Sequence, residues 1–599
     1  MNFPTVKKQF DIIIIGSGGA GLMAAISAIN NGAKNIAVIS KVIPSNSHTV
    51  SAKGGINAAL SNISQDNWKW HAYDTLKGAD YLADVDAVEV LCREAQNAVI
   101  DLEKIGVVFS RNSNGEISQR AYGGQTTNFG QGDVAYRACY SKDKTGHTIL
   151  HSLHQQALKN NVKFFSEFFV TDLLIEDKSQ CHGCLAVDLN SGELVIFESS
   201  VVILATGGYS QIYQNTTSAL ICSGDGSALV FEEGLPLQDM EFVQFHPTGI
   251  FGHGFLVTEA VRGEGGYLLN SQGKRFMENY APKMMELASR DVISQAMATE
   301  IYQGRGLGEN KNFLHLDLRH ISGDILNNKL PGVIELVKNF ARLDAKKDLI
   351  PVAPSAHYTM GGIPTNLDCV VLNGEKEVTG LMAIGEAACV SVHGANRLGC
   401  NSLLDLIVFG KIAGKKAAQK IVSKTGEVAQ KIAAQKIEKL KNIFVPFSSN
   451  QSDQIENLDL NLSQLKKLLQ QNNEKNLNVF REEHLLKQGL SRTQDLFKIF
   501  KNYQIKNKNL LWNEELTAYF ELKNLFLNSL AANFAALNRK ESRGAHYRSD
   551  FKDRDDQNFC AHSLVKMNNQ ENELEFSLKD VRKVSLISEL NLNFQIRKY

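Results

Sequence analysis

The sequence predicts an α/β protein: a Rossmann-type dinucleotide-binding domain with an inserted α+β capping domain, followed by a helical domain and a small C-terminal domain. Three observations predict it. A glycine-rich strand–helix–strand pattern opens the chain at residues 11–41, and a strand of the same kind returns at residues 379–387. The 599 residues also exceed what one compact core holds. An insertion therefore separates the two strand patterns.

The opening unit is expected to consist of a strand at Asp11–Ile15, a helix at Leu22–Ile29 and a second strand at Asn35–Lys41. The first run is continuously apolar, as in a buried parallel strand. Residues Gly16–Gly21 match G-x-G-x-x-G. These glycines permit a tight turn and a close approach of the backbone to a pyrophosphate at the helix N-terminus. The unit therefore predicts a dinucleotide site.

The end of the second strand indicates which dinucleotide binds. An NAD site usually has Asp or Glu there, which binds the ribose hydroxyls. This chain has Ser40 and Lys41 instead. The difference disfavours NAD and leaves FAD as the better candidate.

The later patterns place the remaining domains. Strand-like runs fill residues 164–208, and residues 238–352 have glycine-rich turns and few long helices, as expected of the insertion. The first domain resumes at residues 379–387 and continues into a helix that Asn401 or Ser402 is expected to cap. The expected domains are residues 1–237 with 354–425 (FAD binding), 238–353 (capping and substrate binding), 426–540 (helical) and 541–599 (C-terminal).

The helical domain is expected because residues 426–540 are rich in Lys, Asn, Gln, Leu and Glu. Its apolar residues recur at helical spacing, so that one face of the helix near residue 525 is apolar. That face comprises Tyr519, Leu522, Phe526 and Leu530. The charged run at residues 549–556 is expected to be a solvated loop.

The composition excludes several classes of function. Lys plus Arg and Asp plus Glu both total 64, so no basic excess favours nucleic-acid binding. No apolar run approaches the roughly 18 residues of a transmembrane helix, and the first ten residues lack the apolar core of a signal peptide. The nine cysteines are scattered, as in a reducing compartment. Cys181 and Cys184 have redox or metal spacing, but no second pair accompanies them, so ordinary thiols and no metal site are expected.

Seven spaced motifs resemble the succinate dehydrogenase/fumarate reductase flavoprotein family. They occur in order over nearly the whole chain, whereas the helical region after residue 426 resembles the family only loosely. The motifs are SHTVSAKGG (47–55), QFHPTGI (244–250), LVTEAVRGEGGYLLN (256–270), LASRDV (287–292), HYTMGGIPT (357–365), GANRLGCNSLLDL (394–406) and ESRGAHYRSDF (541–551).

The resemblance implies FAD that is covalently joined, through its 8α-methyl group, to a ring nitrogen of His48. Such a bond raises the flavin potential, which suits the oxidation of succinate. The resemblance and the glycine motif together imply a set of FAD-binding residues. They are Gly16, Ser17, Gly18, Gly19, Ala20, Gly21, Ser40, Lys41, Ser47, His48, Thr49, Gly54, Gly55, Asp225, Glu386, Ser402 and Leu403.

The same resemblance implies a dicarboxylate site. Both ends of succinate need cationic or hydrogen-bonding partners when the molecule is buried, and the matching residues are His246, Thr258, His357 and Arg397. Arg290 matches the arginine that transfers the proton. Glu259 and Arg262 match a proton relay to solvent.

Three positions depart from the family pattern. Asn46 stands where an arginine is common two residues before the flavin-linking histidine, and its expected effect is at most slower attachment. Tyr122 replaces a phenylalanine beside the substrate, and Cys400 replaces a glycine close to the flavin.

The resemblance implies the catalytic flavoprotein subunit of succinate:quinone oxidoreductase. The sequence has no Fe–S or haem motif, so a separate iron–sulfur subunit is expected, and membrane-anchor subunits are reached through it. The expected location is peripheral, on the cytoplasmic face of a bacterial inner membrane or the matrix side of a mitochondrion.

Three alternatives remain. A fumarate reductase runs the same site backwards, although the ending NFQIRKY favours the dehydrogenase. L-aspartate oxidase lacks the flavin-linking histidine and the ESRGAHYRSDF segment. A non-catalytic FAD-binding assembly protein would not need the retained substrate and proton-transfer residues.

Overall fold

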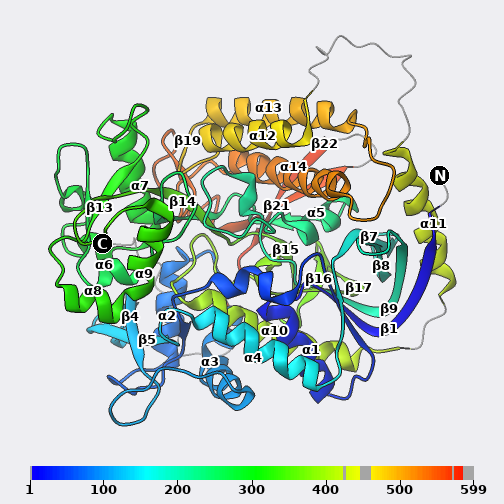
Figure 1. Cartoon of the computed structure of the whole chain (residues 1–599), viewed down its shortest axis with the longest axis horizontal. Helices are drawn as coiled ribbons and strands as arrows, with labels where there is room; N and C mark the ends of the chain where they lie inside the picture. Colours follow the sequence, from blue (N-terminus) through cyan, green and yellow to red (C-terminus); the bar gives the residue numbers. More distant parts are fainter. Residues whose placement is uncertain (1–2, 423–425, 445–459, 569–572, 585–599) are drawn as a thin grey trace.

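The computed structural model describes residues 3–422, 426–444, 460–568 and 573–584, and the largest sheet of these residues is a mixed one of eight strands. Its strands β1, β7, β8 and β9 lie on the right of Figure 1. Strand β1 runs parallel to both of its neighbours, β2 and β9. This architecture confirms the predicted α/β class. The strand order is β16 (Val370–Asn373), β17 (Lys376–Ala383), β8 (Gln180–Asp188), β9 (Leu194–Leu204), β1 (Thr5–Ile15), β2 (Ile36–Ser40) and β6 (Lys163–Ser166), and β7 (Phe168–Glu176) pairs with β8.

Strand β1 shows why the sheet has two covered faces. Alternate residues of a strand point to opposite faces, and all four isoleucines at its end are buried. Ile12 and Ile14 join one core and Ile13 and Ile15 the other. The first core contains residues from α1 (Gly19–Asn30), α3 (Val85–Ile105), α4 (Thr145–Lys159) and α10 (Asn401–Gln419).

Three details of the predicted elements were wrong. β1 begins at Thr5, six residues early, because its polar first half pairs with β9. Helix α1 begins at Gly19 rather than Leu22, so that part of the glycine motif lies in its first turn. Helix α10 is preceded by Cys400 as N-cap, with φ of 67° and no side-chain cap. Asn401 cannot cap because its side chain is buried against Asn57 and Thr75.

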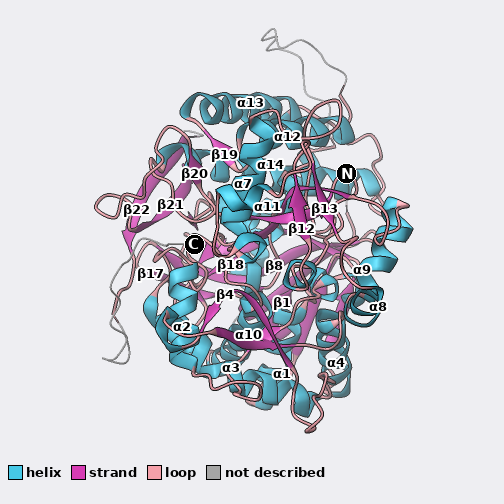
Figure 2. Cartoon of the chain, turned by 90° about the vertical axis from the view of Figure 1, so that its left-hand side faces the viewer, coloured by secondary structure: helices cyan, strands magenta, loops and turns pink. Residues whose placement is uncertain are grey.

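The segment between the two halves of the sheet forms an α+β unit with its own core. Its antiparallel sheet has the order β11 (Val243–Ile250), β14 (Ile350–Thr359), β13 (Leu314–Asp317) and β12 (Tyr267–Leu269). The core contains Val257, Leu268, Met297 and Leu316. Figure 2 views the molecule from the side on which this unit lies. Its helices are α6 (Ala260–Gly263), α7 (Arg290–Tyr302), α8 (Gly323–Lys329) and α9 (Pro331–Leu336).

Helices dominate the chain after residue 426, as predicted. Figure 1 shows α12 and α13 stacked above α14, and the apolar face formed by Tyr519, Leu522, Phe526 and Leu530 is buried. The charged run at residues 549–556 is a loop, also as predicted. The helices are α11 (Glu427–Asn442), α12 (Leu462–Asn476), α13 (Glu483–Lys501) and α14 (Glu514–Asn538).

A buried histidine joins the C-terminal strand to two distant segments. His562 lies on β21 (Ala561–Asn568), which pairs with β22 (Glu573–Asp580) and with β10 (Leu237–Gln238). Its Nδ1 is 2.7 Å from Asp239 Oδ2, and its Nε2 is 3.3 Å from Asp84 Oδ1. Burial alone would lower the pKa of His562, but the two carboxylates outweigh it and raise this pKa to about 9.

The remaining elements are short or peripheral. All nine cysteines are free, and Cys181 and Cys184 are buried in β8. No helix among the described residues has both the length and the apolar character needed to cross a bilayer. The ending NFQIRKY lies outside the described residues. The other elements include β3 (Ile56–Asn57), α2 (Trp68–Gly78), β4 (Gln119–Thr126), β5 (Val134–Cys139), α5 (Asp225–Glu232), β15 (Ile363–Pro364), β18 (Ala388–Cys389), β19 (Phe480–Arg481) and β20 (Tyr547–Arg548).

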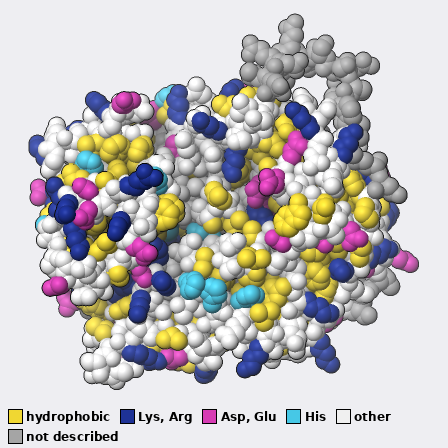
Figure 3. All heavy atoms as spheres, in the orientation of Figure 1, with side chains coloured by type: hydrophobic (Ala, Val, Ile, Leu, Met, Phe, Trp, Pro, Cys, Tyr) yellow, Lys and Arg dark blue, Asp and Glu magenta, His cyan; other side chains and the backbone are white. Residues whose placement is uncertain are grey.

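The outer surface agrees with the neutral composition. On the face shown in Figure 3, Lys and Arg side chains are interspersed with Asp and Glu side chains. No extended field of one sign covers this face.

Candidate functional site

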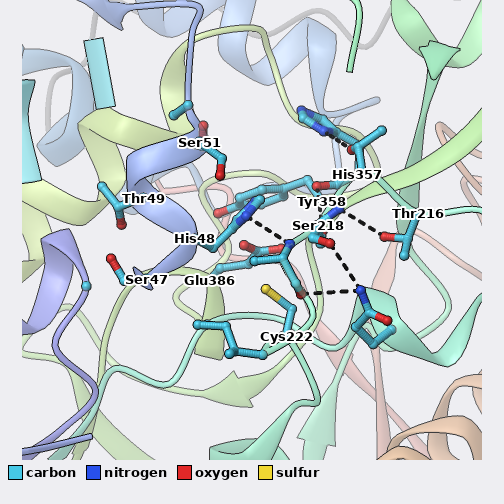
Figure 4. Close-up of a pocket in the computed structure, with 18 of the residues that line it drawn as sticks. Ser47, His48, Thr49, Ser51, Thr216, Ser218, Cys222, His357, Tyr358 and Glu386 are labelled. Carbon is cyan, nitrogen blue, oxygen red and sulfur yellow. Dashed lines mark hydrogen bonds between the residues drawn. The ribbon is translucent and has the colours of Figure 1, made fainter. Parts of the chain in front are cut away.

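One cavity of about 960 Å³ connects the glycine turn to the α+β unit. Its wall brings together the glycine turn, loop 47–55, the start of α10 and one edge of the α+β unit. Twenty-two of the predicted site residues line it. The two others, Gly21 and Arg262, lie behind the wall. Figure 4 shows part of this wall, with His48 and Glu386 on facing segments.

The glycine turn is sterically specified. A Cβ on Gly16, where φ is +114°, would lie 2.2 Å from the carbonyl oxygen of Ala205, and a Cβ on Gly21 would lie 2.1 Å from that of Gly16. Gly21 therefore lets the helix pack against the turn. The N–H of Gly19 donates to Thr49 Oγ1, which ties the turn to loop 47–55.

Two buried hydroxyls beside this turn have no partner among the described residues. Ser17 Oγ and Ser47 Oγ are both buried and both residues line the cavity. A buried hydroxyl without a hydrogen bond is costly. The oxygens of a pyrophosphate would satisfy both, so the residues present fit a dinucleotide.

Lys41 binds two carboxylates rather than standing free at the end of β2. Its Nζ lies 3.0 Å from Asp225 Oδ2 and 2.7 Å from Glu521 Oε1. Burial alone would lower the pKa of Lys41, but the carboxylates outweigh it and raise this pKa. Lys41 thereby holds Asp225 at the cavity wall. Its ion pair with Glu521 also attaches α14 to the domain that contains β2.

His48 is a neutral imidazole at the cavity wall. It begins a 3₁₀ turn at His48–Ser51, and its Nδ1 accepts a hydrogen bond of 3.2 Å from the N–H of Ala219 (Figure 4). Burial lowers the pKa of His48 to about 4. Because Nδ1 is occupied, Nε2 is the ring nitrogen left to bond a ligand.

Two other elements present groups to the same cavity. Glu386 follows β17, its Oε1 accepts from the N–H of Thr359 at 3.0 Å, and burial raises the pKa of Glu386 to about 7. The first turn of α10 contains Ser402 and Leu403 and has no side-chain cap. Its free N–H groups and positive dipole end can therefore face an electron-rich ligand.

Two histidines line the end of the cavity that the α+β unit forms. The rings of His246 and His357 are 5.2 Å apart, centroid to centroid. Burial and the nearby arginine Arg290 hold the pKa of each well below its usual range, so both rings are neutral. His246 Nδ1 accepts from the N–H of Thr248, which places the proton on Nε2, and Nε2 has no partner among the described residues.

Two arginines meet at this end through one glutamine. Gln244 Oε1 accepts from Arg290 Nη1 at 3.1 Å and from Arg397 Nη2 at 2.8 Å. Burial and the neighbouring Arg290 lower the pKa of Arg397 to about 10. The strong concentration of positive charge, together with Thr258 and two neutral histidines, fits a dianion.

A carboxylate connects Arg290 to a second buried arginine. Glu259 Oε2 is 2.8 Å from Arg290 Nε and 3.7 Å from Arg262 Nη2. Burial alone would raise the pKa of Glu259, but the two arginines outweigh it and lower this pKa. The three side chains therefore form a continuous chain of charged groups that begins at the cavity.

Gln244 is a buried residue that bonds two arginines of the cavity wall, and the sequence did not indicate it as functional. It lies in the QFHPTGI motif, two residues before His246 on β11, and the period of a strand places both on one face. That spacing was the available signal. Of the three departures, Asn46 is exposed, whereas Tyr122 and Cys400 are buried in the cavity wall.

The fold and the cavity define an FAD-dependent oxidoreductase. Residues 11–403 match the family model of the FAD binding domain, and residues 466–599 match that of the fumarate reductase flavoprotein C-terminus. The chain belongs to the succinate dehydrogenase/fumarate reductase flavoprotein family.

Named relatives cover nearly all of the chain. The succinate dehydrogenase flavoprotein subunit of Rickettsia conorii is 48% identical over 93% of each chain. The mitochondrial succinate dehydrogenase [ubiquinone] flavoprotein subunit of Oryza sativa is 46% identical over 94% of this chain and 89% of its own. Among solved structures, a mutant E. coli quinol fumarate reductase has a TM-score of 0.89 at 34% identity, covering 97% of this chain and 98% of that one.

Proposed function

We propose that this protein is the catalytic flavoprotein subunit of a succinate:quinone oxidoreductase, which oxidises succinate to fumarate. The observation that supports this is the pair Arg290 and Arg397, held at one end of the FAD cavity by Gln244 beside His246 and His357. Bound FAD supplies the hydride acceptor. The dehydrogenase relatives at 46–48% identity favour this direction over fumarate reduction, which is the alternative.

The side chains divide the work between binding and proton transfer. Arg397, His246, His357 and Thr258 bind the two carboxylates and exclude water from them. Arg290 takes the proton from the substrate carbon adjacent to the one that loses hydride. To do so, its guanidinium first gives a proton to Glu259, whose Oε2 is 2.8 Å from Nε, and it regains its positive charge with the proton from the substrate. Glu259 then delivers the proton toward Arg262.

Covalent attachment of FAD belongs to the same proposal. His48 is neutral and its Nδ1 accepts a hydrogen bond, so its proton is on Nε2, where attachment would replace the N–H by a bond to the 8α-methyl carbon. That carbon would lose one hydrogen, and the two electrons released would reduce the flavin ring. After denaturation of the holoprotein in acid, a fluorescent flavin band should migrate with the chain in a gel. Complete release of flavin from protein matured with its natural partners contradicts the linkage.

An iron–sulfur subunit and membrane-anchor subunits complete the proposed enzyme. Relatives are named as subunits, and no Fe–S motif occurs in this sequence to carry electrons onward. The protein would then act peripherally, at the cytoplasmic face of a bacterial inner membrane or the matrix side of a mitochondrion.

A turnover assay tests the function. The holoenzyme, purified with its partners, should reduce an artificial electron acceptor when succinate is added. Malonate should compete, because it has two carboxylates but no adjacent pair of CH₂ groups to oxidise. No succinate-dependent reduction, or non-competitive inhibition by malonate, would refute the assignment.

A further inference from the structure

Tyr122 places a phenol hydroxyl in the wall of the cavity with nothing to bond. The residue is only 5% exposed, lines the cavity, and its Oη has no hydrogen-bond partner among the described residues. Burying a hydroxyl without a hydrogen bond costs free energy. The hydroxyl therefore needs an acceptor that the protein itself does not supply.

The position of the ring limits where in the cavity this acceptor can lie. A Cβ on Gly54 would lie 3.1 Å from Tyr122 Oη, and a Cβ on Gly399 would lie 3.4 Å from Tyr122 Cδ1. The ring thus lies between the flavin loop and the loop that carries Arg397. The next residue, Gly123, donates its N–H to Glu259 Oε1 at 3.3 Å, which fixes β4 against the proton chain.

Two of the charged neighbours of the hydroxyl, Glu259 and Arg290, belong to the dicarboxylate end. The ionisable groups that act on Tyr122 are Cys400, Arg120, Glu259 and Arg290. Burial raises the pKa of Tyr122 above its usual range, so its proton stays on and the group is a donor. Burial likewise raises the pKa of Cys400 to about 12, and a neutral thiol is only a weak donor.

We propose that Tyr122 is a substrate-positioning residue whose hydroxyl donates a hydrogen bond to one carboxylate of the bound dicarboxylate. This rests on the proposed function and adds a contact beyond Arg397, Thr258 and the two histidines. Family members with phenylalanine at this position lack the donor. The contact is made to the ground state and the transition state alike, so it should act on affinity rather than on the chemical step.

The test replaces the hydroxyl alone. In the holoenzyme, Tyr122→Phe should raise the KM for succinate and the Kd for malonate, read from the flavin absorbance change, by about tenfold or more, as expected for a hydrogen bond to a charged group. The kcat should change less than about twofold. The matched control is Tyr136→Phe on the paired strand β5, where the tyrosine is 39% exposed and outside the cavity wall.

The outcomes separate this inference from the proposed function. Wild-type enzyme that oxidises succinate, with a variant whose malonate Kd stays within about twofold of it, overturns the role of Tyr122 and leaves the function standing. Loss of flavin from the variant, or a changed flavin potential with an unchanged malonate Kd, means that the hydroxyl serves the cofactor. Either result also overturns the inference.

Discussion

At the scale of single residues, the site works by sharing acceptors among cations. Gln244 accepts hydrogen bonds from Arg290 and Arg397, whose charges repel each other. Glu259 forms ion pairs with Arg290 and Arg262. Each acceptor fixes the orientation of the guanidinium groups that it binds. The arginines are thus oriented in the absence of ligand, which would lower the reorganisation that binding of the proposed dicarboxylate requires.

Arg290→Lys should reduce succinate turnover by about 10²–10⁴-fold while flavin stays bound, the range typical of positioned proton transfer. Lysine retains the charge but cannot donate to Glu259 and Gln244 through a fork. Steady-state kinetics and the flavin spectrum would measure both effects. Arg319→Lys, at a partly exposed arginine paired with Asp317, is the control and should leave turnover unchanged. More than about a tenth of the wild-type rate in Arg290→Lys would rule out the proton-transfer role.

At the scale of elements, the flavin cavity depends on how closely two helices approach. Helices α1 and α10 cross where Gly410 and Gly414 face the backbone of α1. A Cβ on Gly414 would lie 2.2 Å from the carbonyl oxygen of Ala24. Since both helix N-termini line the cavity, the crossing sets the distance between the glycine turn and the first turn of α10.

Gly414→Ala should destabilise the protein by about 1–3 kcal/mol, the usual cost of overpacking, and should weaken FAD retention by separating the two N-termini. Thermal unfolding and the flavin content of purified protein would show this. Gly323→Ala is the matched control, because no atom lies within 4 Å of its Cβ position, and it should change stability by less than about 1 kcal/mol. Equal behaviour of the two variants would mean that α1 and α10 move apart freely.

Sequence reasoning succeeded where the signal is local. The glycine turn, the buried strand at residues 11–15 and the apolar face of α14 depend on residues close together in the chain. The contacts of Gln244 with Arg397 and of Lys41 with Glu521 do not, because 153 and 480 positions separate the partners. The predicted N-cap of α10 was wrong for the same reason, because the side chain of Asn401 is hydrogen-bonded to residues of α2 and β3, which lie far upstream. The roles of the site residues and the domain limits stay predictions.

At the scale of the whole molecule, one buried histidine makes stability depend on pH. The pKa of His562 is about 9 in the folded protein against 6.5 for a free histidine. Because its pKa is raised, protonated His562 stabilises the folded state fully below pH 6.5, and this stabilisation is lost as pH rises through 9. Its size is about 3 kcal/mol.

His562→Gln should remove this pH dependence. The wild type should lose stability between pH 6.5 and 9, whereas the variant should be less stable at pH 6.5 and nearly flat across that window. Thermal unfolding across the pH series measures it. His484→Gln, at an exposed histidine of α13, is the control. If the dependence of stability on pH that the wild type shows persists in His562→Gln, another group causes it.

The α+β unit should close as a body on the dicarboxylate, with a hinge near residues 237–240. Residues 351–354, the other hinge that the sequence suggests, pair within β14 with β11 and β13 and therefore move with the unit. Malonate bound between Arg290 and Arg397 would hold the two sides together and exclude water. Hydrogen exchange should therefore slow in β11, α7 and β14 when malonate is added, and stay unchanged in α13. Identical exchange at the cavity with and without malonate would mean a rigid, preformed site.

The link from His562 to Asp84 and Asp239 also orders events during synthesis. A chain leaves the ribosome N-terminus first, so both carboxylates emerge more than 300 residues before the histidine that neutralises them. Until translation reaches β21, Asp84 and Asp239 stay without their shared cation, and β10 stays without its partner strand. The contacts of β21 with the start of the α+β unit can therefore form only near the end of translation, so a prematurely terminated chain would leave that edge of β10 unpaired.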